Sequence, residues 1–233
     1  MKNVFKLLGI IALVTIIIFS ATACSGDEGG GEPSYDTPGG SNVTMSANSL
    51  TLKGKVYEIE TTMKGYIFNE FKGNLTLVID DGITLGSGSV SGGSLNYTIN
   101  SPPSSSDLMS IQEYFEDATY SNTNAKGFML NGFSTNNNFY LSLLKISFSA
   151  SSEVYEQIYF LYVDTPVTII KQEEKHQEFT LSGVNLSLTQ GWNTICEKEE
   201  YSMSGGKRSM FKMTSIPSSF TWVLQEVYGA IED

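Results

Sequence analysis

The stretch GNLTLVIDDGITLGSGSVSGGSLNYTI, residues 73–99, carries the clearest fold signal in the chain. Apolar side chains recur at every second position in two runs, first Leu75, Leu77 and Ile79, then Leu95, Tyr97 and Ile99. Because side chains alternate between the two faces of a β-strand, this period predicts strands with one buried face. Asp80, Asp81 and Gly82 follow the first run and predict a turn. The stretch therefore predicts antiparallel β-structure.

The same kind of pattern continues toward the C-terminus. Residues 153–163 (EVYEQIYFLYV) are almost continuously apolar and aromatic, which is typical of a strand that is covered on both faces. The apolar positions change phase at residues 182–183, where Ser is followed by Gly. This phase change predicts a bulge or a tight corner between two strands.

One segment has helical rather than strand spacing. Residues 108–117 (LMSIQEYFED) place their apolar side chains on one helical face, and Ser106 or Asp107 would cap the helix. Residues 220–231 are compatible with a strand or a helix. We expect about eleven to thirteen strands and one short helix, an all-β antiparallel sandwich or barrel-like body over residues 42–233. Its division into two packed halves, about 42–103 and 104–233, is left open.

The N-terminus has the organisation of an export signal. Lys2 and Lys6 precede an apolar run at residues 7–19, whose helical length of roughly 20 Å is short of the ~30 Å membrane core. Small residues follow at 20–23, and then Cys24. The run and the small residues predict a signal peptide over residues 1–23. Residues 25–41 (SGDEGGGEPSYDTPGGS) are rich in Gly, Ser, Pro and acidic residues, so residues 24–41 are expected to form a disordered tether.

The segment around Cys24 resembles the lipobox of bacterial lipoproteins. The resemblance implies that the Cys24 thiol is diacylated, that the chain is cut before it, and that the new amino terminus is acylated. Ala21 stands where Leu is usual, as in the relaxed boxes of spirochaetes and Bacteroidetes. The alternative is an ordinary signal peptide that is cut after Ala23 and leaves an unmodified thiol.

Composition excludes several classes of function. A formal charge of −11 argues against nucleic-acid binding, which normally uses a basic face. The one histidine, His176, excludes a multi-histidine metal site, so no metal or cofactor is expected. Cys196 is followed by carboxylates that would raise the pKa of its thiol, which favours a structural cysteine over a nucleophile. We therefore expect no catalytic residues and no enzyme, with a hydrolase as a weaker alternative.

Aromatic side chains are the candidates for ligand binding. Many lie in the predicted strands: Tyr57, Tyr66, Phe68, Phe71, Tyr155, Tyr159, Phe160 and Tyr162. Trp192 and Trp222 lie near predicted strand ends or turns and are the two candidate ligand-binding residues. Exposed planar rings on a β-face would stack on sugars, whereas buried rings would only fill the core.

Taken whole, the sequence resembles the β-rich lipoproteins of unknown function of Treponema-type spirochaetes. The resemblance rests on the relaxed lipobox, the tether, residues 73–99 and the segment LSLTQGWNTI at 186–195. A second similarity is to the fimbrillin-like lipoproteins of Bacteroidetes. These resemblances imply a non-enzymatic envelope protein held on the membrane by palmitate-type acylation of Cys24, with Ser25 favouring the outer over the inner membrane. They imply a binding or structural module, with carbohydrate binding or adhesion as the alternative, and leave the glycan or protein partner open.

Overall fold

The computed structural model describes residues 37–62, 65–79, 83, 85–135, 139–149, 151–175, 179–202 and 205–226. This part of the chain is nearly all β-strand, as the alternating pattern predicted. Within it, no helix has the length and apolar character needed to span a membrane. The predicted signal peptide at residues 1–23 lies outside the described residues, and so do Cys24, Asp80, Asp81 and His176.

Seven strands close into a barrel. In order around the ring they are β2 (Leu50–Thr62), β6 (Ser94–Ile99), β5 (Ser87–Ser91), β4 (Leu75–Val78), β10 (Phe133–Thr135), β11 (Phe139–Phe148) and β19 (Thr221–Glu226), which returns to β2. The closing pair, β19 with β2, is parallel, whereas the other neighbours in the ring are antiparallel. An odd number of strands requires this, because directions cannot alternate all the way round.

The barrel interior holds the largest hydrophobic core. Most of its members come from the ring strands, among them Leu50, Leu52, Val56, Leu95, Tyr97, Ile99, Phe133, Leu141, Leu143, Trp222 and Leu224. Residues outside the ring strands complete this barrel core: Phe128, Leu130, Ile158, Phe160, Tyr162, Trp192 and Cys196. Gly54 lies within β2 at φ +148°, and a Cβ there would be 3.0 Å from Cδ1 of Trp222. The glycine therefore lets the long strand bend closely around the indole.

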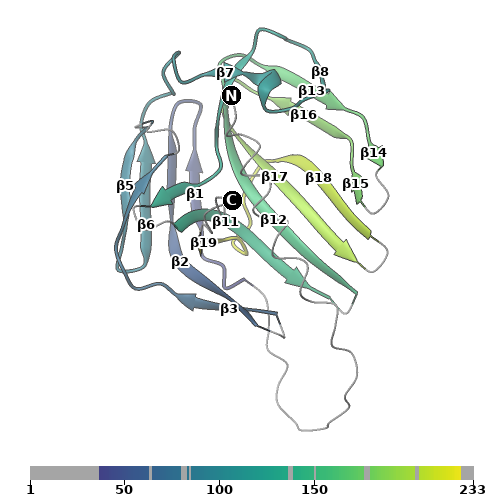
Figure 1. Cartoon of the computed structure of the whole chain (residues 1–233). Coiled ribbons are helices and arrows are strands. Elements are labelled where there is room, and N and C mark those ends of the chain that lie inside the picture. Colours follow the sequence, from purple (N-terminus) through teal and green to yellow (C-terminus); the bar gives the residue numbers. More distant parts are fainter. Residues whose placement is uncertain are drawn as a thin grey trace, which may run out of the picture.

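A second sheet extends from the barrel through β11 (Figure 1). Its strands are β12 (Ser152–Val163), β17 (Gly191–Ser202), β18 (Gly205–Met213), β15 (Phe179–Leu181) and β14 (Glu174–Lys175), while β9 (Lys126–Leu130) pairs with β12 and β7 (Met109–Ser110) pairs with β9. Two further strands, β1 (Asn42–Met45) and β3 (Gly65–Glu70), pair with β2. In Figure 1 the barrel lies at the left and this second sheet at the right.

A separate small sheet contributes to a second core. It consists of β16 (Val184–Leu188), β13 (Val167–Lys171) and β8 (Thr119–Tyr120). Its inward side chains and those of the larger sheet form a cluster that includes Ile111, Leu161, Val163, Ile169, Leu186 and Ile195. The phase change at residues 182–183 falls between β15 and β16, which belong to different sheets, so the predicted corner is confirmed.

The helix predicted at residues 108–117 is wrong in extent. Only Ile111–Glu113 is helical, as a 3₁₀ turn (η4) with Ser110 as its N-cap. The preceding residues, Met109 and Ser110, pair with β9 instead. Backbone hydrogen bonding to a neighbouring strand has overridden the local helical spacing.

Two predicted boundaries also change. The barrel takes β2, β6, β5 and β4 from the first part of the chain and β10, β11 and β19 from the second, so residues 42–103 and 104–233 are not separate packed halves. Residues 37–41, assigned to the tether, lie against the barrel: Thr37 is buried, and Gly40 N–H donates to the Ser218 carbonyl at 2.9 Å. Residues 221–226 of the ambiguous C-terminal segment form strand β19.

Candidate functional site

The most unusual group of side chains lies on one face of the second sheet. Strand register places Tyr155 of β12 opposite Glu199 of β17, and Glu199 opposite Arg208 of β18. Because side chains alternate along each strand, the same face carries their neighbours at every second position. We call the set Glu153, Tyr155, Tyr159, Glu197, Glu199, Tyr201 and Arg208 the tyrosine–carboxylate cluster.

Arg208 is the centre of this cluster. Its Nε donates to Glu197 Oε1 and lies 3.5 Å from Glu199 Oε1. Only 6% of the Glu197 side chain and 13% of the Glu199 side chain are exposed. A buried carboxylate is tolerated only when it is paired and hydrogen-bonded, so the guanidinium is what allows these two acids to lie inside the fold.

Tyrosine hydroxyls complete the hydrogen bonding of both acids. Tyr159 donates to Glu197 Oε2 at 2.5 Å, and Tyr201 donates to Glu199 Oε2 at 2.8 Å. Charge-assisted hydrogen bonds of this kind are the stronger class in proteins. Each buried acid therefore has at least one cationic and one phenolic neighbour.

The pKa values of the cluster follow from burial and proximity. Burial raises the pKa of Tyr159 well above its ordinary value, and the nearby charge of Glu197 adds to the effect. Burial likewise raises the pKa of the Glu199 carboxyl. For Arg208 burial acts to lower the pKa, but Glu197, Glu199 and Tyr159 together leave the pKa raised. The phenols stay neutral donors and the guanidinium stays charged.

A row of aromatic rings continues the cluster toward β3. Tyr66 and Tyr155 share a hydroxyl–hydroxyl hydrogen bond, and burial raises the pKa of Tyr66 to about 12. The Tyr66 and Tyr155 ring centroids are 6.2 Å apart at 75°, and those of Tyr155 and Tyr201 are 6.2 Å apart at 79°. Edge-to-face pairs of this kind stabilise by roughly 0.5–1.5 kcal/mol beyond their buried area. The rings form a herringbone row, which leaves single half-buried ring faces instead of one flat platform.

The tyrosines of this cluster are poorly suited to acid–base chemistry. A catalytic base or nucleophile needs a pKa near the working pH, whereas the phenol pKa values here are displaced upward. Among the described residues, no group of His, Cys, Asp and Glu has the arrangement of a metal site.

The prediction that Trp192 and Trp222 bind a ligand is contradicted by their burial. Trp192 is 4% exposed and Trp222 is 1% exposed, and both belong to the barrel core. The Trp222 indole N–H donates to the Lys53 carbonyl at 3.1 Å, so its polar edge is also used internally. Neither ring offers a face to a ligand, because Trp222 of β19 packs inside the barrel and Trp192 of β17 packs against Phe128 and Tyr162 of the second sheet.

The prediction for Cys196 is confirmed. The residue is a free, fully buried thiol in the barrel core, and burial raises its pKa to about 12. A thiol in this state is a small apolar core residue and not a nucleophile.

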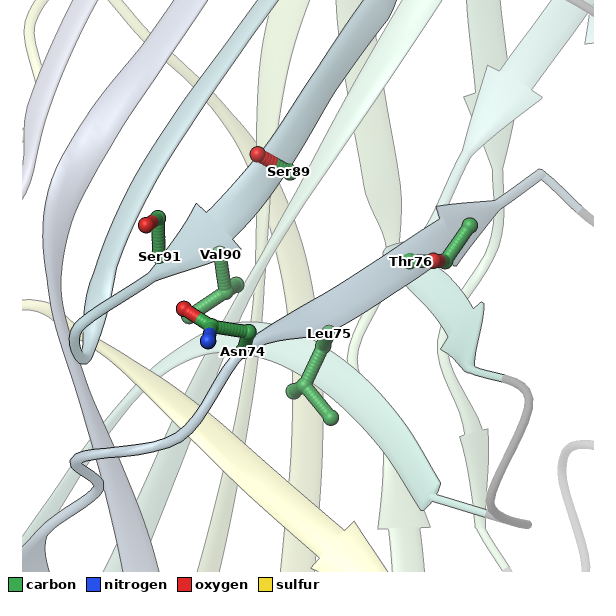
Figure 2. A pocket seen from close by; sticks show the side chains of 6 residues that line it. All are labelled: Asn74, Leu75, Thr76, Ser89, Val90 and Ser91. Carbon is green, nitrogen blue, oxygen red and sulfur yellow. The ribbon is translucent and has the colours of Figure 1, made fainter.

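A shallow hollow lies on the barrel wall between β4 and β5 (Figure 2). Its volume is about 250 Å³, and it is lined by Asn74, Leu75, Thr76, Ser89, Val90 and Ser91. Asn74 Oδ1 already accepts the Gly92 N–H at 3.0 Å. The lining lacks aromatic and charged side chains, so it offers a ligand only weak neutral hydrogen bonds.

The sequence contained part of the signal for the cluster. Tyr66, Tyr155 and Tyr159 were among the aromatics considered, and Arg208 is the single arginine of the chain. Arginine is the preferred cation for a buried ion pair, so its solitary occurrence was a usable clue. What could not be seen was that Glu197 and Arg208, from neighbouring strands, would meet.

No family model, curated protein or solved structure matches the chain. The chemistry of the site therefore rests on its own residues.

Proposed function

We propose that this chain is exported and anchored through lipid on Cys24, with its β-body acting as a non-enzymatic binding or structural module of the cell envelope, the outer membrane being favoured. The observation that carries this proposal is the apolar run at residues 7–19, followed by small residues and then Cys24. Acylation at both the thiol and the new amino terminus would exceed the two-signal requirement for stable membrane attachment.

The start of the folded body is consistent with a short connection to the lipid. Thr37 Oγ1 donates to the Ser219 carbonyl at 2.8 Å, and Ser41 N–H donates to the Phe220 carbonyl at 3.3 Å. Residues 25–36 then separate Cys24 from the body. At a maximum of about 3.6 Å per residue, they span no more than about 43 Å. An anchored body would therefore work close to the membrane surface.

The interior of the tyrosine–carboxylate cluster supports a role without catalysis. Glu197 and Glu199 are each bound to Arg208 and to a tyrosine hydroxyl within the fold. Internal partners that occupy these groups leave them little capacity for proton transfer to a substrate. The cluster supports a stable scaffold whose outer residues, Tyr155 and Tyr201, remain half-exposed.

Metabolic labelling with a palmitate analogue tests the anchor. The wild-type chain should incorporate label and partition into the detergent phase of a Triton X-114 extraction, and Cys24→Ser should lose both properties. Cys196→Ser is the matched control and should keep them, because its thiol is buried in the barrel. An unlabelled wild-type chain whose amino terminus is a free Cys24 would establish the ordinary signal peptide instead, and label retained in Cys24→Ser would also reject the proposal.

A second candidate function is carbohydrate binding or adhesion, now placed on the tyrosine row instead of the tryptophans. The observation that favours it is the contact of half-exposed Tyr155 and Tyr201 with the carboxylates of Glu153 and Glu199. Aromatic faces beside carboxylates suit sugar rings and their hydroxyl groups. A glycan array with the full chain should give hits that Tyr201→Ala weakens and Tyr57→Ala, a half-exposed tyrosine on β2, does not. An array without hits would reject this function.

A further inference from the structure

The opposite face of the second sheet carries a small hollow. Leu181 of β15 lies opposite Arg208 of β18, so these two side chains share the face of the tyrosine–carboxylate cluster. By alternation, Ser182 and the two neighbours of Arg208, Lys207 and Ser209, lie on the other face. Lys198 and Glu200 of β17 are opposite Ser209 and Lys207. Together these residues line a hollow of about 140 Å³: Ser182, Lys198, Glu200, Lys207 and Ser209. We call it the Ser182 hollow.

Ser182 is held rigidly at the wall of this hollow. Its backbone N–H donates to the Arg208 carbonyl at 2.8 Å, which continues the parallel pairing of β15 with β18. Its hydroxyl oxygen is buried and has no hydrogen-bond partner among the described residues. Buried polar groups in native proteins are nearly always partnered, so this hydroxyl calls for a partner from outside the chain.

The charges around the hollow favour an anion. The Lys198 Nζ lies 3.4 Å from Glu200 Oε2, so the charges of these two side chains partly neutralise each other. Lys207 is exposed and forms no ion pair with any residue in the described ranges. The lining therefore keeps one uncommitted ammonium group beside two serine hydroxyls, a set of donors with a net positive charge.

The size of the hollow narrows the class of anion. At roughly 30 Å³ per water molecule, about 140 Å³ corresponds to between four and five waters, which suits a tetrahedral oxyanion better than a larger organic acid. Ser182, Ser209 and Lys207 all line the hollow, and a tetrahedral anion has an oxygen for each of these three donors. We propose that the Ser182 hollow binds a phosphate group, as the free ion or as the phosphoryl end of a headgroup. This proposal does not depend on the lipid anchor.

Phosphorus NMR on the full chain in non-ionic detergent tests the site. The line of inorganic phosphate at millimolar concentration should broaden in the presence of the chain. Lys207→Gln and Ser182→Ala should each weaken the apparent affinity about tenfold, as expected for loss of a charge-assisted or buried hydrogen bond. Lys175→Gln is the control, because the Lys175 side chain is 75% exposed on a different strand. Circular dichroism confirms that the variants are folded.

Competition separates the two sources of the phosphate group. Recovery of the narrow phosphate line at a glycerol phosphate concentration below that of the inorganic phosphate supports a headgroup. A phosphate line that stays broad at equal concentrations of the two supports the free ion. An unbroadened phosphate line with the wild-type chain would overturn the proposal. Equal weakening by Lys207→Gln and Lys175→Gln would overturn it too, since that result would show attraction to surface charge alone.

Discussion

Replacement of Arg208 by Met removes the one positive charge that the described residues bring into contact with the buried Glu197 side chain. The Glu197 side chain is 6% exposed, and among the described residues it would keep the Tyr159 hydroxyl, 2.5 Å from its Oε2, as a hydrogen-bond partner. Methionine keeps much of the length of the arginine stem, so packing against the sheet is largely maintained. The substitution thus tests the charge more than the volume.

The expected cost follows from the burial of the acid. Breaking a buried ion pair by removing one partner costs about 3–5 kcal/mol, because the other charge is left without compensation. Arg208 is itself 26% exposed, so water will reach part of the vacated space, and we expect the lower end, about 3 kcal/mol. Glu197→Gln combined with Arg208→Met should recover much of this loss, since no charge is then stranded.

Urea denaturation followed by tryptophan fluorescence measures the effect. Trp192 and Trp222 are both buried in the hydrophobic core, so unfolding moves them into water and shifts their emission. The midpoint should fall in Arg208→Met with an unchanged slope, which would indicate a loss of stability without a change in the exposed surface.

Lys55→Met is the matched control. The Lys55 Nζ lies 2.8 Å from Glu70 Oε1, but the two side chains are 56% and 42% exposed. Water therefore solvates either charge when the other is removed. This variant should unfold at nearly the wild-type urea concentration. If Arg208→Met lost no more stability than Lys55→Met, or if the double variant were less stable than Arg208→Met, the reasoning about the cluster would be refuted.

Three further predictions concern the core, the pH dependence and a tight turn. In a Cys24→Ser background, Cys196 should resist iodoacetamide at mildly alkaline pH and react after urea unfolding, because burial raises the pKa of its thiol to about 12. A full adduct on the native chain in mass spectrometry would contradict this prediction. Glu199→Gln should stabilise the chain at neutral pH, because burial raises the pKa of the Glu199 carboxyl in the folded state. The wild-type carboxyl favours folding below its ordinary pKa of 4.5 and loses that contribution as the pH rises through the raised folded pKa. The stability advantage of Gln in urea titrations should therefore grow with pH, and a difference that stays constant with pH would count against this reasoning. Gly93→Ala should destabilise the fold far more than Gly92→Ala. Both glycines have positive φ, but an added Cβ at Gly93 would lie 1.8 Å from the Phe71 carbonyl oxygen, whereas one at Gly92 would meet no atom within 4 Å. Equal melting temperatures of the two variants would refute the steric argument.

The sequence predicted the elements of this fold better than their partners. Alternation at 73–99 corresponds to β4, β5 and β6, and the phase change at 182–183 corresponds to a switch between sheets. The helix predicted at 108–117 does not form because Met109 and Ser110 pair with β9. The sequence around Met109 and Ser110 contains no signal for this pairing. Local spacing describes a segment in isolation, whereas strand pairing depends on which segment arrives beside it.

The candidate site illustrates the same limit at the level of side chains. The positions of Trp192 and Trp222 near predicted strand ends favour ligand binding, yet both side chains are buried in the hydrophobic core. Glu197 appears in the sequence as one of a run of charged residues, and only its pairing with Arg208 makes it a buried acid. Whether a strand residue faces core or solvent depends on what covers that face, which the residue's own neighbours in sequence do not encode.

What the sequence determined by itself was the β-class of the body, the net negative charge of the chain and the apolar run at residues 7–19, because alternation, composition and hydropathy do not depend on which strands pair. Only the tertiary structure decided that seven strands close into a barrel, that β19 closes it in parallel with β2, and that Arg208 lies between Glu197 and Glu199. Trp222 of β19 lies opposite Val56 of β2 although most of the chain separates them. Such contacts depend on the register of distant strands and on the burial that results, and both arise only when the whole chain packs.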